Sequence, residues 1–117
     1  MKRIPASLLA LLLSAGMTQA IAGSCDINYT RTACPGKEEI SYKKCDGKQS
    51  CTKTVAAASA EECQTKAVAA CANDRLDITK SKVITATFDG KPVANKAGGS
   101  DHCLDYAKRD TEFNQCK

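Results

Sequence analysis

The sequence has no tryptophan, one histidine and two methionines, and both methionines, Met1 and Met17, lie near the N-terminus. Phenylalanine occurs twice and tyrosine three times, so few large side chains are available to fill a core. Metal carriers that use thioether or imidazole ligands would lack those ligands here. No two cysteines have the C-x-x-C spacing, which excludes a thioredoxin-type dithiol and a c-type haem attachment. The sequence therefore predicts no cofactor and no metal site.

The first 22 residues have the pattern of an export signal. Lys2 and Arg3 precede an apolar stretch at residues 8–13, and residues 20–22 (Ala-Ile-Ala) form the small-x-small pattern that signal peptidase accepts. We place the cut before Gly23. The apolar stretch is shorter than the roughly 20 residues that a membrane span requires, and no later segment qualifies. We predict an exported chain, periplasmic or secreted, with no membrane span.

Processing would leave 95 residues, 23–117, enough for one domain. This length excludes a doubly wound dinucleotide-binding enzyme or a barrel enzyme. Removal of the signal also leaves 15 basic and 13 acidic residues, which is close to balance. The longest basic runs are the pairs Lys43-Lys44 and Lys108-Arg109, each with acidic residues nearby, so the sequence shows no basic face for nucleic acid.

Cysteine makes up about 8% of the processed chain, a level typical of small disulfide scaffolds. Exported compartments allow disulfides to form and persist, and a core with few large side chains depends on such bridges. The pairing stays open, because eight cysteines allow 105 connectivities. We predict that all eight are in disulfides: Cys25, Cys34, Cys45, Cys51, Cys63, Cys71, Cys103 and Cys116.

The clearest predicted element is a helix at about residues 60–72. Ser59 and Glu62 form a capping box at its start, and apolar residues then recur at helical spacing. Cys63 and Cys71 fall on the same side of this helix, about 12 Å apart, which is too far for a bridge between them. Each should therefore bridge the helix to a different segment, the cysteine-dense N-terminal zone or the tail.

A β-hairpin is predicted near residues 82–94. Residues 82–88 are rich in β-branched side chains, and Asp89-Gly90 is a favoured two-residue hairpin turn. The return strand should be short and at an edge, because Pro92 has no N–H to donate. One face of the hairpin would be exposed and rich in threonine. The sequence thus predicts an α+β fold, with one main helix packed on a small antiparallel sheet.

Other segments carry ambiguous patterns. Residues 38–44 combine an i,i+4 acidic–basic pair, which favours a helix, with alternating apolar residues, which favour a strand. Cys45 and Cys51 flank a turn, so they either close their own loop or pair elsewhere. Residues 95–101 are predicted to form a flexible loop, and residues 101–116 to form a short helix or an irregular tail.

The pair His102-Cys103 is the only arrangement with a catalytic appearance. Adjacent residues seldom present their side chains to each other, so we expect Cys103 in a disulfide and His102 exposed to solvent. The sequence contains no phosphate loop, nucleophile elbow or EF-hand. We therefore predict no catalytic residue.

These observations predict a small, exported, disulfide-stabilised binding protein without enzymatic activity, such as an inhibitor, an accessory subunit or a surface-assembly component. Its expected partner is another protein, because disulfides hold loops rigid and so reduce the entropy lost on binding. The candidate contact loops are residues 46–50 and residues 89–91. The alternative is a redox or metal-handling protein with a reactive thiol at Cys103, or at Cys45 and Cys51.

Overall fold

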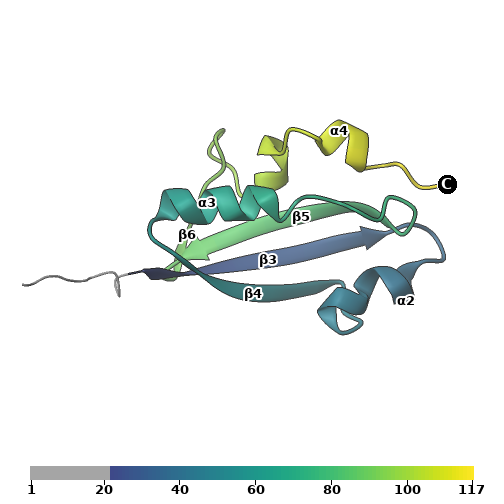
Figure 1. Ribbon diagram of the computed structural model, residues 1–117, viewed down its shortest axis with the longest axis horizontal. Coiled ribbons are helices and arrows are strands. Elements are labelled where there is room, and N and C mark those ends of the chain that lie inside the picture. The colour runs from purple at the N-terminus through teal and green to yellow at the C-terminus, as the bar shows by residue number, and fades with distance from the viewer. Residues whose placement is uncertain (1–21) are drawn as a thin grey trace, which may run out of the picture.

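A four-stranded antiparallel sheet, in the order β4-β3-β5-β6, forms the centre of the fold. The structure is a computed structural model that describes residues 22–117. The predicted export signal falls almost wholly on residues 1–21, outside the described residues. Figure 1 shows α3 and the C-terminal segment with α4 on one side of the sheet.

Strand β3 (Gly23–Ala33) lies between β4 (Ser50–Ala57) and β5 (Thr79–Phe88). In β3, Cys25 and Ile27 are buried whereas Asn28 is exposed, the alternation of a strand with one face on a core. The sequence analysis identified neither β3 nor β4. The alternation in β3 was a usable signal, whereas β4 is mostly exposed and its strand conformation depends on pairing with β3.

The predicted hairpin is confirmed, with β6 (Lys91–Pro92) as a two-residue edge strand. Asp89 (φ 50°) and Gly90 (φ 82°) both have positive φ, as a type I′ turn requires. On β5, Ile84 is fully buried whereas Val83 is 45% exposed. The two faces of this strand therefore divide as the sequence predicted.

Helix α3 (Ala60–Ala69) is the predicted main helix, and it ends slightly earlier than expected. The Glu62 amide donates to Ser59 Oγ at 3.1 Å, which confirms the cap. In a standard capping box the Glu62 carboxylate would accept from the amide of the N-cap residue, Ser59. Here it accepts from the amide of the preceding residue, Ala58. Cys63 and Ala67 face the sheet and pack in the core with residues of β3 and β5.

The ambiguous segments form short helices. Residues 38–45 comprise α2 (Glu38–Ser41) and the 3₁₀ helix η3 (Tyr42–Cys45). The tail forms the 3₁₀ helix η4 (His102–Asp105) and α4 (Arg109–Glu112). The helical alternative is therefore correct for both segments.

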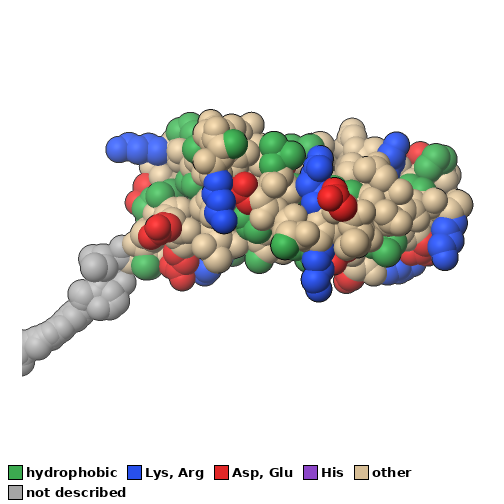
Figure 2. All heavy atoms as spheres, turned by 90° about the horizontal axis from the view of Figure 1, so that it is seen from above, with side chains coloured by type: hydrophobic (Ala, Val, Ile, Leu, Met, Phe, Trp, Pro, Cys, Tyr) green, Lys and Arg blue, Asp and Glu red, His purple; other side chains and the backbone are tan. Residues whose placement is uncertain are grey.

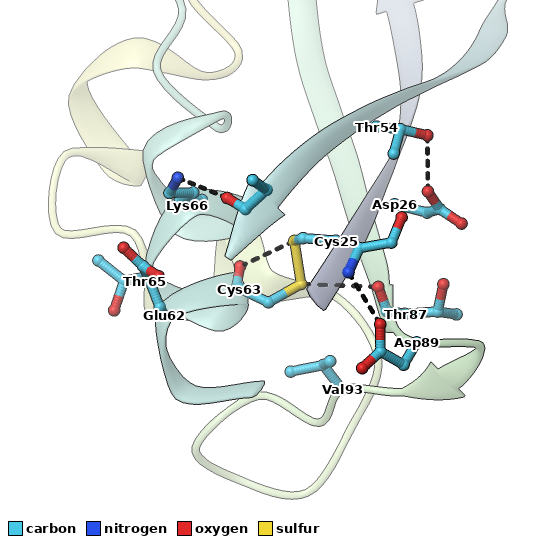
Figure 3. The surroundings of a disulfide bond; sticks show 12 residues. Cys25, Asp26, Thr54, Glu62, Cys63, Thr65, Lys66, Thr87, Asp89 and Val93 are labelled. Atoms are coloured by element: carbon cyan, nitrogen blue, oxygen red, sulfur yellow. Dashed lines mark hydrogen bonds between the residues drawn. A yellow bond between two sulfur atoms is a disulfide. The ribbon is translucent and has the colours of Figure 1, made fainter. Parts of the chain in front are cut away.

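Four disulfides join these elements: Cys25–Cys63, Cys34–Cys116, Cys45–Cys51 and Cys71–Cys103. Figure 3 shows the first of them linking β3 to α3. Cys63 in α3 bonds to the N-terminal zone and Cys71, two residues beyond the end of α3, bonds to the tail, as their spacing predicted. The Cys45–Cys51 bridge closes its own short loop. The structure thus confirms a small disulfide-rich α+β domain.

The loop at residues 95–101 differs from the flexible segment that we predicted. Asn95 is buried, and its Oδ1 accepts hydrogen bonds from the amides of Ala97 and Gly99 at 3.0 and 2.8 Å. Its Nδ2 donates to the Asp101 carbonyl at 2.8 Å. One asparagine side chain thus satisfies the backbone of the loop and holds both ends together.

The face of the sheet opposite α3 is lined by short polar side chains. Thr52, Asn28 and Thr85 form one row across β4, β3 and β5, and Thr54, Asp26 and Thr87 form the next. Thr54 Oγ1 donates to Asp26 Oδ1 at 2.6 Å. The expected threonine-rich face is therefore present, and it extends across three strands.

Candidate functional site

The face of the sheet that carries α3 changes from apolar to cationic along its length. Ile27 and Ile84 lie beneath α3, and the same alternation continues to Arg31 on β3 and Lys82 on β5. These two cations are direct partners in the strand register. Arg31 is only 4% exposed and Lys82 only 9%. The sheet therefore places two buried positive charges side by side.

Arg31 has no acidic partner. Its Nη1 donates to Cys45 Sγ at 3.1 Å, and its guanidinium carbon lies 5.2 Å from the centre of the Tyr29 ring. Within residues 22–117, no carboxylate oxygen lies within 4.0 Å of the guanidinium. Burial lowers the pKa of Arg31, although nearby Tyr29 and Asp74 act in the opposite direction. A sulfur atom and an aromatic ring compensate a guanidinium less than a carboxylate does.

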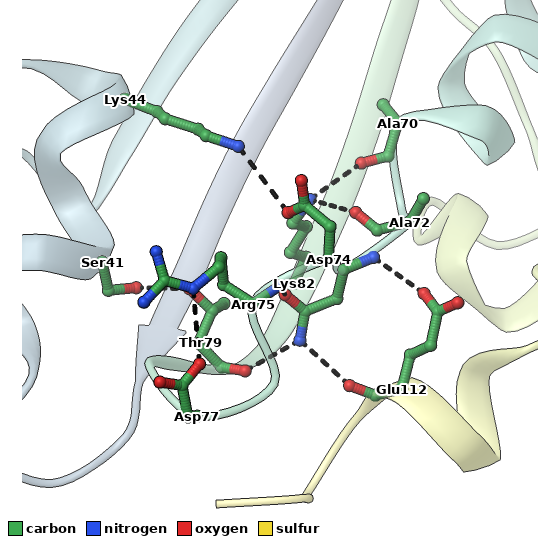
Figure 4. A network of polar contacts seen from close by, with 11 residues as sticks. Ser41, Lys44, Ala70, Ala72, Asp74, Arg75, Asp77, Thr79, Lys82 and Glu112 are labelled. Atoms are coloured by element: carbon green, nitrogen blue, oxygen red, sulfur yellow. Dashed lines mark hydrogen bonds and ion pairs between the residues drawn. The ribbon is translucent and has the colours of Figure 1, made fainter.

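Lys82 also lacks an acidic partner among the described residues. Its Nζ donates to the carbonyls of Ala72 and Ala70, at 2.5 and 3.4 Å, just beyond the end of α3 (Figure 4). This position suits a cation, because the C-terminal end of a helix carries a partial negative charge. Burial, followed by repulsion from Arg31 and Lys44, still lowers the pKa of Lys82 from 10.5 to about 8.

A cavity of about 30 Å³ opens beside these two side chains. It lies between the α2–η3 segment and the loop that joins α3 to β5. At its rim, Lys44 Nζ lies 3.8 Å from Asp74 Oδ1, and both side chains are mostly exposed. The lining contains four basic residues and one acidic residue: Arg31, Ile40, Ser41, Lys44, Asn73, Asp74, Arg75, Ile78, Thr79 and Lys82.

Buried hydrogen bonds hold the walls of this cavity in place. Asn73 Nδ2 donates to the carbonyls of Thr79 and Glu112, at 2.8 and 2.9 Å. Glu112 Oε1 accepts from the Asn73 amide and from the Tyr106 hydroxyl, both at 2.8 Å. These bonds, the Asn73 amide foremost, lower the pKa of Glu112. Across the cavity, the hydroxyls of Ser41 and Thr79 are 2.7 Å apart. These bonds fix the walls of the cavity beside Lys82 (Figure 4).

The structure separates the two loops that we expected to form contacts. The loop 46–50 lies near the cavity, because Cys45 at its start contacts Arg31. The hairpin tip at residues 89–91 lies at the opposite end of β3, since Phe88 pairs with Cys25. Only the first loop can therefore share a contact surface with the cationic cavity.

The expectation that His102 is exposed was wrong. Its side chain is fully buried, and Nε2 lies 2.9 Å from the Val93 carbonyl. The reason is that the Cys71–Cys103 bridge and the Asp101 cap draw η4 onto the sheet. Cys103 is in that disulfide, so it is not paired with His102 as a nucleophile.

Sequence reasoning did not find Arg31 or Lys82. Both residues continue the apolar alternation of a half-buried strand, at positions 25, 27, 29 and 31 of β3 and at 88, 86, 84 and 82 of β5. A charged residue in such a series was the available signal. For Arg31 it could not be used, because β3 had not been recognised as a strand; for Lys82, at the start of the predicted strand, it was available and was overlooked.

The structure offers few other sites. Among residues 22–117, no group of three or more potential metal ligands is found, and no helix is long and apolar enough to cross a membrane. Figure 2 shows basic and acidic side chains interspersed over the face that carries α3. Comparisons with family models, curated proteins and solved structures found no match to this chain. The cationic cavity is therefore the candidate site of this protein.

Proposed function

We propose that this chain is a small, exported, disulfide-stabilised binding protein that recognises another protein and catalyses no reaction. Its place of action would be the periplasm or the extracellular space, because four disulfides indicate an oxidising environment. The observation that carries the proposal is the pair of buried cations, Arg31 and Lys82, beside an open cavity.

The burial of Arg31 and Lys82 has a cost in folding free energy. A buried cation without a counter-charge destabilises a fold, and an apolar residue at either position would avoid this cost. Two such cations are adjacent here, so each also raises the cost of the other. A ligand that supplies negative charge would offset both effects, which gives binding a favourable electrostatic contribution.

The pairing of the cysteines favours binding over thiol chemistry. All eight cysteines are in disulfides, so the described residues contain no free thiol for a redox step or a metal. The cavity instead presents preorganised hydrogen-bond donors on strands that the disulfides stabilise. This arrangement suits recognition, because little conformational entropy is lost when a partner docks.

Photo-crosslinking in the cells that make the protein would test this proposal. A photoreactive residue in place of Lys44, at the rim of the cavity, should give one adduct of defined mass. The same residue in place of Lys91, at the distant hairpin tip, should not. Equal labelling from both positions, or no adduct from either, would contradict recognition through this site.

An intact-mass measurement would test the structural basis of the proposal. After alkylation without reductant, we expect a chain that begins at Gly23 and carries neither alkyl groups nor metal. Labelling of two or more cysteines, or metal in the native spectrum, would favour the thiol-dependent alternative. In that case the labelled cysteines would mark the site.

A further inference from the structure

We propose that the cavity between Arg31 and Lys82 binds a single carboxylate group, contributed by an acidic side chain or C-terminus of the partner. This inference rests on the proposed function and names the chemistry of its site. Three features carry it: the donor geometry, the size of the cavity and the charges at its rim.

The donors fit an anion with two adjacent oxygen atoms. Arg31 donates one identified hydrogen bond, to Cys45 Sγ. Within residues 22–117, the only fully buried side-chain nitrogen or oxygen without a partner is His102 Nδ1, so the remaining guanidinium nitrogens keep some contact with solvent, and Arg31 lines the cavity. A guanidinium binds a carboxylate through two parallel N–H···O bonds. Lys82, directly opposite on β5, adds a second positive charge.

The size of the cavity favours a carboxylate over a larger anion. A volume of about 30 Å³ is enough for about two water-sized groups. The two oxygens of a carboxylate match that space, whereas a tetrahedral phosphate or sulfate has additional charged oxygens that would lie outside it. The Asp74 carboxylate at the rim repels any anion in the cavity, and it repels a phosphate or sulfate more strongly than a carboxylate because these anions carry more negative charge.

The rim can respond to an incoming carboxylate. Lys44 pairs with Asp74 at 3.8 Å, and both side chains are more than half exposed, so this ion pair contributes little stability. Lys44 is therefore free to turn toward a carboxylate in the cavity. Its long side chain would then cover the bound group and strengthen the interaction by excluding water.

An NMR titration of the full exported protein would test this inference. Sodium acetate, sodium phosphate and sodium chloride would be added separately at equal ionic strength and near-neutral pH. The signals to follow are the Arg31 side-chain N–H and the backbone amides of residues 73–82. We expect saturable shifts with acetate, and smaller, non-saturating shifts with the other two salts.

Three variants would locate the binding. Arg31→Lys keeps the positive charge but removes the planar guanidinium that can make two parallel hydrogen bonds to a carboxylate. It should weaken acetate binding about tenfold or more. Lys44→Gln should weaken it about two- to threefold, as expected for an exposed charge. Lys91→Gln is the matched control, since it removes the same charge roughly 20 Å away along β5, and should have no effect.

Each contrary result has a distinct meaning. Phosphate that saturates where acetate does not would overturn the assignment to a carboxylate. Equal shifts with all three salts, or an equal loss in Lys91→Gln and Lys44→Gln, would show a general charge effect and overturn the site. If acetate binds but the photo-crosslinking experiment captures no protein, the carboxylate site stands and the proposal of protein recognition is refuted. If the photo-crosslinked adduct forms equally in Arg31→Lys, the protein still recognises a partner, but this cavity is not the site of recognition.

Discussion

Three buried polar residues, Arg31, Lys82 and His102, occupy positions that an apolar side chain could fill. The two cations lie beside a cavity, whereas His102 is enclosed and has one ring nitrogen, Nδ1, without a partner. Buried polar groups usually have their hydrogen bonds satisfied, and among the described residues only His102 Nδ1 is buried without a partner, whereas the two cations have hydrogen bonds but no carboxylate partner. Each leads to a different measurable consequence.

Lys82 should make the stability of the protein increase with pH in the mildly alkaline range. Its pKa is lowered to about 8 in the folded state, against 10.5 as the ordinary value, because of burial and of repulsion from Arg31 and Lys44 that Asp74 and Glu112 only partly offset. Between these two values the unfolded chain binds more protons, so the free energy of unfolding rises with pH. Below pH 8 both states are protonated and the effect disappears.

Urea unfolding from about pH 7.5 to 9.5 would measure this effect as the difference between the wild type and Lys82→Gln. The difference isolates Lys82 from other groups that titrate in the same range, provided that they are unaffected by the substitution. The wild type should gain stability relative to the variant as the pH rises. Parallel curves would show that Lys82 keeps an ordinary pKa in the fold.

His102→Ala should lower the free energy of unfolding by about 3 kcal/mol, because it opens a cavity and leaves the Val93 carbonyl without its partner. Leu104→Ala is the control, since Leu104 lies in the same short helix and is 57% exposed. The control should change stability by less than about 0.5 kcal/mol. Similar small losses in both variants would indicate that His102 is exposed after all.

At the scale of elements, α3 depends on its N-terminal cap. The helix has only ten residues, a length that is marginal in isolation, so the cap and the packing against the sheet must stabilise it. The packing is anchored by the Cys25–Cys63 bridge in the first turn. The cap therefore contributes to an element that already has a fixed position.

Ser59→Ala should cost about 1 kcal/mol of stability, because it removes the acceptor for the Glu62 amide. Thr65→Ala, at an exposed position on the same helix, is a suitable comparison and should change stability by less than half of that. Chemical denaturation of both variants measures the difference. An equal effect at the two positions would mean that the cap contributes nothing.

At the scale of the whole molecule, the four disulfides differ in how much chain they enclose. Cys34–Cys116 spans 82 residues and ties the end of β3 to the C-terminal tail, whereas Cys45–Cys51 spans 6. In the chain-entropy account, a bridge stabilises by restricting the unfolded state, and it does so more strongly for a longer loop. The long bridge should therefore matter more to global stability.

Replacing both cysteines of the long bridge by alanine should cost about 4 to 5 kcal/mol, against about 2 kcal/mol for the short bridge. Thermal and urea unfolding of the two double variants would measure the difference. The short bridge also carries the sulfur that contacts Arg31, so its removal should affect acetate binding as well. Equal destabilisation by the two replacements would contradict the loop-length argument.

The sequence by itself determined the local features. The Ser59 cap, the Asp89-Gly90 turn and the division of β5 into two faces depend on residues close together in the chain, so their chemistry can be recognised without the fold. The eight cysteines likewise predicted a disulfide-rich domain. The bridge of residues 45 and 51 stayed one of two possibilities, because the alternative depended on cysteines far along the chain.

Only the tertiary structure decided the remaining features. Strand β4 is mostly exposed, so it is a strand because β3 supplies its hydrogen-bond partners. His102 is buried because the disulfide from its neighbour Cys103 to Cys71, just beyond the end of α3, holds η4 against the core. The cationic cavity exists because antiparallel register brings Arg31 next to Lys82, fifty-one positions later in the chain. Long-range pairing creates each of these features, and no local pattern in the sequence specifies it.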